Sequence, residues 1–225
     1  MTAPPVTATS PRAILAVDGI DGSGKSTFAH TLLTSLRGHG CEGVIVSVDD
    51  FRRPIEWSAL DRPEVDVYFD SYYDLDLAER CLREFMAGAA RVTIPRYDVL
   101  TERIDGTREL GFAGAHVAIV EGVFPLRIPA VAEGVVIYLE ASEPEVRRRI
   151  IERDTKKRRS REETEARIDR RYFPSQERYR ALFAPRDRAD IVIDNEDPTA
   201  PRAVRRDLAR VAEPLRGLLD RALPS

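Results

Sequence analysis

The chain has 225 residues, of which 43% are hydrophobic and 32% are charged, and its formal net charge is −3. This length is typical of one large domain, and the slightly acidic balance argues against binding of nucleic acid through a basic surface. Its two cysteines provide neither a disulfide framework nor a metal-binding spacing, which favours a reducing compartment, and we expect a cytoplasmic protein.

The start of the chain is not expected to be a signal peptide. Residues 1–11 are rich in Pro, Thr and Ala and lack the basic and apolar regions of a signal peptide, so we expect a disordered tail there. No uncharged apolar run approaches the roughly 18 residues of a membrane helix, so no membrane partner is expected. Residues 12–225 are predicted to form a single domain.

The first predicted element is a buried strand over residues 13–17, which leads into the segment Gly19-Ile20-Asp21-Gly22-Ser23-Gly24-Lys25-Ser26. This segment matches the P-loop pattern G-x-x-x-x-G-K-[ST] at every specified position, and a helix over 27–37 is predicted after it. Glycines let the backbone approach a polyphosphate closely, and the helix start directs free N–H groups at it. The residues predicted to bind ATP in this segment are Gly19, Asp21, Gly22, Ser23, Gly24, Lys25, Ser26 and Thr27.

Two of these residues have more specific expected roles. The Lys25 ammonium is predicted to reach the β and γ phosphates and to serve in catalysis. The Ser26 hydroxyl is predicted to complete part of a Mg²⁺ shell.

Strands and helices alternate along the rest of the chain. Strand-like runs occur at 44–48, 116–120, 135–139 and 190–194, and the last of these is expected to be the final strand. Helices are predicted over 74–86 and 200–223, and alternation with turn signals predicts a β excursion over 91–110. This order predicts a three-layer α/β fold of the P-loop NTPase type, with a mostly parallel sheet of about five strands and helices on both faces.

Acidic residues follow two of the predicted strands. Asp49 and Asp50 come directly after the second strand, where they could hold Mg²⁺, accept a proton from an acceptor hydroxyl, or cap a helix. Glu121 ends the apolar run 118–120, which is the Walker B arrangement that supports a Mg²⁺ shell. Since ligands bind at the carboxyl ends of parallel strands, we expect these acids near the P-loop.

Residues 147–171, here called the lid segment, are the most basic stretch, with twelve Arg or Lys against six Asp or Glu. Most of these charges are expected to form ion pairs on a solvated helix. Arg153, Arg158 and Arg161 are candidates to neutralise a moving phosphoryl group from a helical lid. The segment lacks the interleaved aromatic residues of a nucleic-acid site.

Taken in order, these pieces resemble the uridine kinase family, within the P-loop kinases that include phosphoribulokinase and pantothenate kinase. The resemblance covers about four fifths of the chain. Its matching pieces are Gly19–Thr27, Ser47-Val48-Asp49-Asp50-Phe51, Tyr68-Phe69-Asp70, Ile94-Pro95-Arg96-Tyr97-Asp98, Glu121-Gly122-Val123-Phe124, Arg153-Asp154 and Arg186-Asp187-Arg188-Ala189-Asp190-Ile191-Val192-Ile193.

The resemblance implies a role for several residues. Asp49 would be the catalytic base beside Mg²⁺, Glu121 the Walker B acid, and Arg153 a catalytic lid residue with Arg158 near ATP. At the acceptor, the resemblance places Phe69, Asp70, Tyr97 and Arg103, while Asp50 falls where the family varies. With Asp50, Glu102 and Arg161 added, the residues predicted at the acceptor are Asp50, Phe69, Asp70, Tyr97, Glu102, Arg103 and Arg161.

One departure concerns the acceptor. Uridine kinases commonly carry a histidine a few residues after the tyrosine that corresponds to Tyr97, whereas this chain has Glu102 there. A carboxylate accepts hydrogen bonds where a protonated histidine donates them, so the donor pattern is changed. The lid segment also reads Lys157-Arg158-Arg159-Ser160 in place of the family's Arg-Gly step.

The sequence therefore predicts an ATP- and Mg²⁺-dependent kinase for a primary hydroxyl of a nucleoside or nucleoside-like molecule. Kinases for pantothenate, nicotinamide riboside or an antibiotic stay open, as does a homo-oligomer. A non-catalytic nucleotide switch is the alternative from another class, although the chain lacks the Asn-Lys-x-Asp and Leu-Ser-Gly-Gly segments of two such groups. Trp57 is expected to cover the acceptor pocket or to pack in the core or at its rim.

Overall fold

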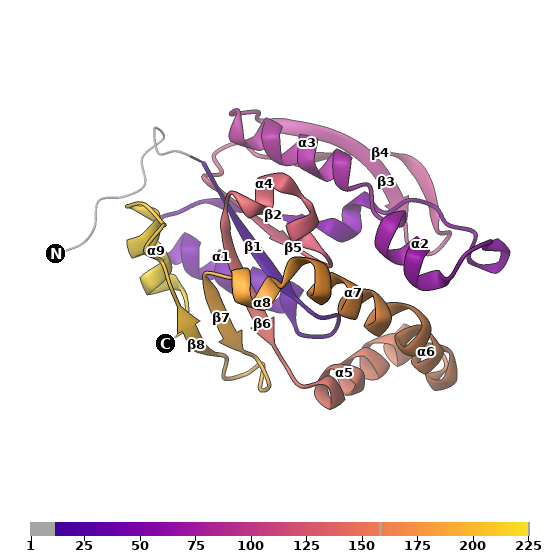
Figure 1. Ribbon diagram of the computed structural model, residues 1–225. Coiled ribbons are helices and arrows are strands. Elements are labelled where there is room, and N and C mark those ends of the chain that lie inside the picture. The colour runs from indigo at the N-terminus through magenta and orange to yellow at the C-terminus, as the bar shows by residue number, and fades with distance from the viewer. Residues whose placement is uncertain (1–11, 158, 225) are drawn as a thin grey trace.

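The computed structural model describes residues 12–157 and 159–224, so the predicted tail 1–11 and Arg158 lie outside the described residues (Figure 1). A six-stranded sheet forms the centre, with the spatial order β2-β5-β1-β6-β7-β8, and β3 and β4 form a separate two-stranded hairpin. Every pairing in the large sheet is parallel except that of β8 with β7. The strands are β1 (Ala13–Gly19), β2 (Gly43–Ser47), β3 (Arg91–Asp98), β4 (Arg103–Gly111), β5 (Val117–Glu121), β6 (Val135–Glu140), β7 (Ile191–Asp194) and β8 (Arg202–Arg206).

Helices cover both faces of the sheet (Figure 1). A π-helical turn, Ile168–Tyr172, joins α6 to α7. No helix in the described part of the chain is long and apolar enough to cross a membrane. The α-helices are α1 (Lys25–Gly38), α2 (Glu64–Asp70), α3 (Leu75–Met86), α4 (Pro129–Ala132), α5 (Glu143–Lys156), α6 (Arg161–Arg167), α7 (Phe173–Phe183), α8 (Pro185–Arg188) and α9 (Leu215–Ala222).

The alternation of side chains along the strands divides the core into two layers. Leu15 and Val17 of β1 pack in one buried cluster with the apolar faces of α1 and α9. Ile14 and Ala16 lie in the other cluster, with α3, α4 and α7. Because successive residues of a strand point to opposite faces, a fully apolar strand such as β1 requires cover on both sides.

The order of the strands places the P-loop at the centre of the sheet. β1 lies between β5 and β6, so the loop that follows β1 is flanked by the residues after two other strands. Gly22 has a φ of +80°, and a Cβ there would lie 2.9 Å from the Ile150 side chain and from the Val146 carbonyl oxygen. Glycine is therefore required where the loop passes under α5.

The structure corrects the prediction for the C-terminal region. The expected helix over 200–223 is replaced by β8, a connection and the shorter α9, so 190–194 is not the final strand and the sheet has six strands rather than about five. The sequence Arg202-Ala203-Val204-Arg205-Arg206 is polar because β8 is an edge strand, where charged side chains are favoured. The predicted β excursion over 91–110 is the β3–β4 hairpin.

Candidate active site

The P-loop forms a cradle at the start of α1. Lys25 is only 6% exposed, and its Nζ donates hydrogen bonds to the carbonyl oxygens of Gly19 (2.8 Å) and Ile20 (2.9 Å). Ser23 is fully buried, and its carbonyl oxygen accepts a hydrogen bond from Asn195 Nδ2 (2.6 Å). The loop is therefore held in shape from both sides. The cavity that it borders, called here the P-loop cavity, is lined by Asp21, Gly22, Gly24, Lys25, Ser26, Thr27, Asp49, Glu121, Gly122, Val123, Arg149 and Arg153.

A hydroxyl and a carboxylate meet inside this cavity. The Ser26 hydroxyl donates a hydrogen bond of 2.7 Å to Glu121 Oε2, so the first turn of α1 and the end of β5 are joined there. Asp49, at the end of β2, lines the same cavity. Since β2 and β5 are neighbouring parallel strands, the two carboxylates come from adjacent strand ends, and both lie near the P-loop as the sequence predicted.

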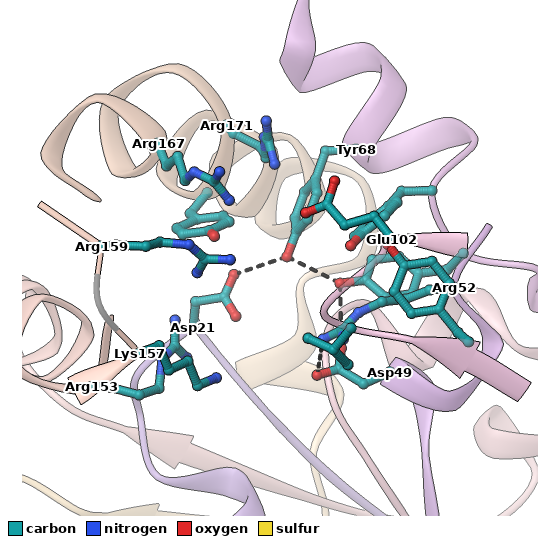
Figure 2. Close-up of a pocket in the computed structure, with 15 residues that line it drawn as sticks. Asp21, Asp49, Arg52, Tyr68, Glu102, Arg153, Lys157, Arg159, Arg167 and Arg171 are labelled. Atoms are coloured by element: carbon teal, nitrogen blue, oxygen red, sulfur yellow. Dashed lines mark hydrogen bonds and ion pairs between the residues drawn. The ribbon is translucent and has the colours of Figure 1, made fainter. Parts of the chain in front are cut away.

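A second cavity, called here the tyrosine-lined cavity, lies beside the first (Figure 2). It shares Asp21, Asp49 and Arg153 with the P-loop cavity. Its volume is about 120 Å³. Its lining residues are Asp21, Asp49, Arg52, Tyr68, Tyr72, Tyr73, Tyr97, Val99, Glu102, Arg153, Lys157, Arg159, Arg167, Arg171 and Tyr172.

Asp49 and Asp50 point in different directions. The Asp49 carboxylate pairs with Arg52 and accepts a hydrogen bond from the Tyr73 hydroxyl at 3.5 Å. The Asp50 carboxylate pairs with Arg108 of β4 and lies outside both cavities. Ser47 occupies the N-cap of the short 3₁₀ turn Val48–Phe51, so neither acid has the capping role considered for it.

Hydrogen bonds join the Asp49 side to Asp21 across the tyrosine-lined cavity. The Tyr68 hydroxyl donates to Asp21 Oδ2 (3.4 Å), and the Tyr73 hydroxyl lies 3.2 Å from the Tyr68 hydroxyl, so its single proton is shared between Tyr68 and Asp49, as the dashed lines in Figure 2 show. Burial raises the pKa of Asp21, and the positive charges of Lys25 and Arg153 offset this only in part. Burial also raises the pKa of Tyr68 and Tyr73 well above 10, which keeps both hydroxyls protonated as donors.

The lid segment contributes cations to the tyrosine-lined cavity. Arg153 is near the end of α5 and pairs with Asp154, whose fully buried carboxylate also accepts from Arg159 at 2.9 Å. Arg167 and Arg171 are four residues apart on α6 and the π-helical turn, so they share one face. One buried carboxylate thus orients two of the arginines that line the cavity.

Five residues predicted at the acceptor lie outside this lining. Asp50 pairs with Arg108, Asp70 pairs with Arg178 at 3.1 Å, and Arg161 pairs with Glu165 at 2.9 Å on the outer side of α6. Phe69 is buried against Phe124 in the core. Arg103 is exposed at the start of β4. Of the predicted acceptor residues, Tyr97 and Glu102 do line the cavity.

Sequence reasoning missed most of the aromatic and cationic lining. Tyr68 is adjacent to the predicted pair but faces the cavity, because consecutive helical residues are about 100° apart around the axis. Arg52 follows Asp49 by three residues and was recognisable as a candidate from that spacing. Arg159, Arg167 and Arg171 carried no signal that separated them from the other basic residues of the lid segment.

Comparison with known proteins supports the same reading of the fold. A possible uridine kinase from Bacillus stearothermophilus is 23% identical, with a TM-score of 0.62 and coverage of 83% of this chain and 91% of that chain. A protein described as a fructose transport system kinase, from a Silicibacter species, is 24% identical, with a TM-score of 0.63 and coverage of 78% and 88%. Phosphoribulokinase from Rhodobacter spheroides is 19% identical, with a TM-score of 0.57 and coverage of 82% and 70%. At these identities the likeness is one of fold.

A family model gives the assignment. The model of the phosphoribulokinase/uridine kinase family matches residues 14–199, which include the P-loop, both strand-end carboxylates and the lid segment. Since that match spans most of the chain, the protein belongs to the phosphoribulokinase/uridine kinase family and is a P-loop kinase of small-molecule substrates.

Proposed function

We propose that the protein transfers the γ-phosphoryl group of ATP to a hydroxyl group of a small molecule bound in the tyrosine-lined cavity. The observation that carries the proposal is that this cavity and the P-loop cavity share Asp21, Asp49 and Arg153. A phosphoryl group at the end of a triphosphate in one cavity then faces an acceptor in the other. A nucleotide switch has no use for a second cavity of this kind.

Different residues of the chain have different roles in the phosphoryl transfer. The P-loop amides and Lys25 bind the triphosphate, and Asp49 accepts the proton of the acceptor hydroxyl. The acceptor oxygen forms a bond to the γ-phosphorus while the bond from that phosphorus to the bridging oxygen breaks, and ADP leaves with the electron pair. Arg153 lies where the transferred group passes and stabilises its negative charge.

The donor set fits Mg²⁺. The described residues contain no group of three or more His, Cys, Asp or Glu side chains that could hold a metal ion by themselves. Mg²⁺ bound with a nucleotide usually takes one or two protein ligands together with phosphate oxygens and water. Ser26 and Glu121 would hold it, with Asp49 beside them. When bound, the ion neutralises charge on the phosphates.

The acceptor predicted from the sequence is a nucleoside or a similar molecule with a primary hydroxyl. Tyr97 and Glu102 supply an aromatic face and a hydrogen-bond acceptor for such a group, and both line the cavity. The other kinase substrates considered, such as pantothenate or nicotinamide riboside, would use the same Asp49 and P-loop.

The first test of the proposal uses Lys25→Ala. Removing the ammonium that lies against the P-loop should lower ATP turnover by at least a hundredfold, since it takes away a charge that contacts the phosphates. Product formation would be followed by mass spectrometry with ATP, Mg²⁺ and a panel of nucleosides, vitamins and sugar derivatives. Circular dichroism and the melting temperature would show that the fold is intact. Equal turnover in the variant and the wild type would contradict the proposal.

A further inference from the structure

Among the described residues, five cations line the tyrosine-lined cavity without lining the P-loop cavity, and one of them, Arg52, is paired with Asp49. The other four are Lys157, Arg159, Arg167 and Arg171, and the last three of these are half-buried or buried. The P-loop cavity has its own cations in Lys25, Arg149 and Arg153. The four additional cations are therefore not needed to bind the triphosphate.

Three of these cations are held in place by carboxylates that lie outside the cavity lining. Arg159 pairs with Asp154 at 2.9 Å, Arg167 pairs with Glu163 at 2.9 Å, and Arg171 pairs with Glu64 at 2.8 Å. A guanidinium group has five N–H donors in a fixed plane, and each of these ion pairs uses only one or two of them. Donors are left that can serve a ligand in the cavity.

Arg171 is the most constrained of the three. Its side chain is 7% exposed, and its guanidinium carbon lies 3.4 Å from the centroid of the Trp57 ring. A stacked and desolvated guanidinium is already oriented before a ligand arrives, so less entropy is lost when an anion binds to it. Trp57, whose role the sequence left open, packs beside the cavity in this way.

The three acidic residues that line the cavity do not form ion pairs with the described cations of the lid segment. Asp49 is paired with Arg52, and Asp21 accepts from Tyr68 near the P-loop. Glu102 comes from the connection between the strands of the hairpin, and Figure 2 shows Asp49 and Arg52 on the side of the cavity opposite Arg159 and Arg167. The side formed by the lid segment is thus cationic.

We infer that the acceptor is a hydroxylated molecule with an anionic group, either a phosphomonoester or a carboxylate, held by Arg159, Arg167 and Arg171. This inference rests on the proposed kinase function. The acceptor hydroxyl lies at Asp49 and the anionic group lies across the cavity at the arginines, with Glu102 accepting hydrogen bonds from further hydroxyls. An uncharged nucleoside would offer no charged partner to the N–H donors of these arginines that their ion pairs leave free.

The size of the cavity supports a small acceptor. Pockets for drug-sized ligands have volumes of roughly 300–1,000 Å³, whereas this cavity has about 120 Å³. A phosphorylated or oxidised sugar is smaller than a nucleoside that carries the same ribose and a base. Charge-assisted bonds from paired N–H donors also give arginine its preference for phosphate and carboxylate.

The tryptophan provides a direct test of anion binding. Trp57 is the only tryptophan, so intrinsic fluorescence reports on the environment of Arg171. The full-length protein would first be saturated with Mg²⁺ and a non-hydrolysable ATP analogue, so that added anions do not enter the P-loop. Inorganic phosphate would then be titrated, followed by glucose 1-phosphate, gluconate, glucose and uridine. We expect a saturable change with the anions and none with glucose or uridine.

Two variants connect this response to the arginines. Arg159→Gln and Arg167→Gln should each raise the dissociation constant for inorganic phosphate by about ten- to a hundredfold, as expected when one charge-assisted hydrogen bond is lost. Arg148→Gln is the matched control, because Arg148 is on α5 but 61% exposed and pairs with Glu145 and Glu152. An unchanged constant in both cavity variants, or no saturable response to any anion, would overturn the inference.

Turnover with the same compounds separates this inference from the proposed function. Glucose 1-phosphate, gluconate and glucose all keep a free primary hydroxyl, so they differ mainly in charge. The inference expects at least tenfold higher kcat/KM for the anionic members, and the preferred one identifies the anionic group as phosphate or carboxylate. Uridine turned over as well as the anions would overturn the inference and leave the kinase proposal standing. Absence of ATP binding, equal in wild type and Lys25→Ala, would defeat the kinase proposal, and the inference about its acceptor would fall with it.

Discussion

At the scale of single residues, the pairing of each carboxylate decides what it can do. Asp49 and Asp50 are neighbours in sequence, but Asp49 lines both cavities while Asp50 pairs with Arg108. Asp18, one residue before the P-loop, is 1% exposed and accepts hydrogen bonds from the Tyr179 hydroxyl (2.7 Å) and the Gly19 amide (2.6 Å). These acids differ in partner and burial rather than in chemistry.

The base assignment is tested by Asp49→Asn. The amide keeps the size of the side chain but cannot accept the hydroxyl proton, so kcat should fall by about 10²–10⁴. ATP affinity, measured by calorimetry, should change much less. Asp76→Asn on the exposed side of α3 is a matched control that should retain wild-type turnover. A kcat for Asp49→Asn within threefold of the wild type would exclude Asp49 as the base.

The same comparison can settle the prediction made for Asp70. Its carboxylate pairs with Arg178 and lies outside the tyrosine-lined cavity, so Asp70→Asn should leave KM for the acceptor nearly unchanged. A large rise in KM would restore the acceptor role that the resemblance implied.

The stability of the protein should depend on the ionisation of Asp18. Burial raises the pKa of Asp18 to about 6 from 3.8, although the hydrogen bond from Tyr179 lowers it in part. The native pKa lies above the unfolded one, so the protonated carboxyl stabilises the fold at low pH, and this contribution is lost as pH rises from about 4 through 6. The loss corresponds to about 3 kcal/mol.

Urea unfolding at several pH values measures this effect. The free energy of unfolding of the wild type, minus that of Asp18→Asn, should fall by about 2 kcal/mol between pH 4 and pH 7, since the carboxyl of the unfolded chain is already partly ionised at pH 4. The test uses the change of this difference with pH and not its absolute value, because the amide also changes the hydrogen bonds to Tyr179 and Gly19. A difference that is independent of pH would show that the Asp18 pKa is not raised.

At the scale of elements, the end of α5 and the start of α6 are organised around one buried carboxylate. Asp154 accepts from Arg153 (2.8 Å) and from Arg159 (2.9 Å), and its side chain is fully buried. Ser160 caps α6 by accepting from the Glu163 amide (3.1 Å). The π-helical turn Ile168–Tyr172 then brings Tyr172 to the same cavity as Arg167 and Arg171. Such turns are rare and often lie at functional sites.

Replacement of Asp154 tests this organisation. Asp154→Asn removes the charge that orients two cavity arginines, so kcat/KM should fall at least tenfold while the helical content by circular dichroism stays the same. Asp169→Asn is the control, since Asp169 pairs with Arg147 on the exposed surface of the lid segment. Wild-type kcat/KM in Asp154→Asn would mean that Arg153 and Arg159 do not depend on this carboxylate for their positions.

At the scale of the whole molecule, the elements that pack on one face of the sheet are different from those that line the tyrosine-lined cavity. The cluster that contains α1 and α9 supports the sheet from one side, whereas α2, the lid segment and the hairpin β3–β4 contribute residues to the tyrosine-lined cavity. Charge is divided as well. The chain has a net charge of −3, yet six of the fifteen residues that line this cavity are Lys or Arg and only three are acidic. Net charge therefore does not indicate the local potential of a site.

This division predicts a substitution that affects stability without affecting the site. Leu219 of α9 is fully buried in the cluster on the far side of the sheet from the tyrosine-lined cavity. Leu219→Ala should lower the free energy of unfolding by about 2–5 kcal/mol, because a buried leucine leaves a cavity when truncated. At a temperature where the variant is folded, kcat should stay within twofold of the wild type. A larger loss of kcat in fully folded variant would show that α9 is coupled to the site.

The parts of the fold that could be predicted are those specified by a local sequence pattern. A local sequence pattern predicts the P-loop, the strand before it and the helix after it. The glycines, Lys25 and Ser26 that would contact the phosphates occupy nearby positions in one segment. The prediction of one helix over 200–223 was wrong because β8 has the polar composition of an edge strand. Its pairing with β7 is a tertiary contact. The apolar spacing of the region held no information about that pairing.

The sequence by itself determined the family, the parallel α/β architecture, and the placement of Asp49 and Glu121 beside the P-loop, because strand ends in such a sheet meet at one edge. Only the tertiary structure decided which residues line the second cavity. Both Tyr68 and Phe69 pack against Phe124, but only Tyr68 lines the cavity, because consecutive residues of α2 point in different directions. Arg159, Arg167 and Arg171 are distinguished from the other basic residues of the lid segment by their burial and ion pairs, which arise from packing between elements far apart in the chain.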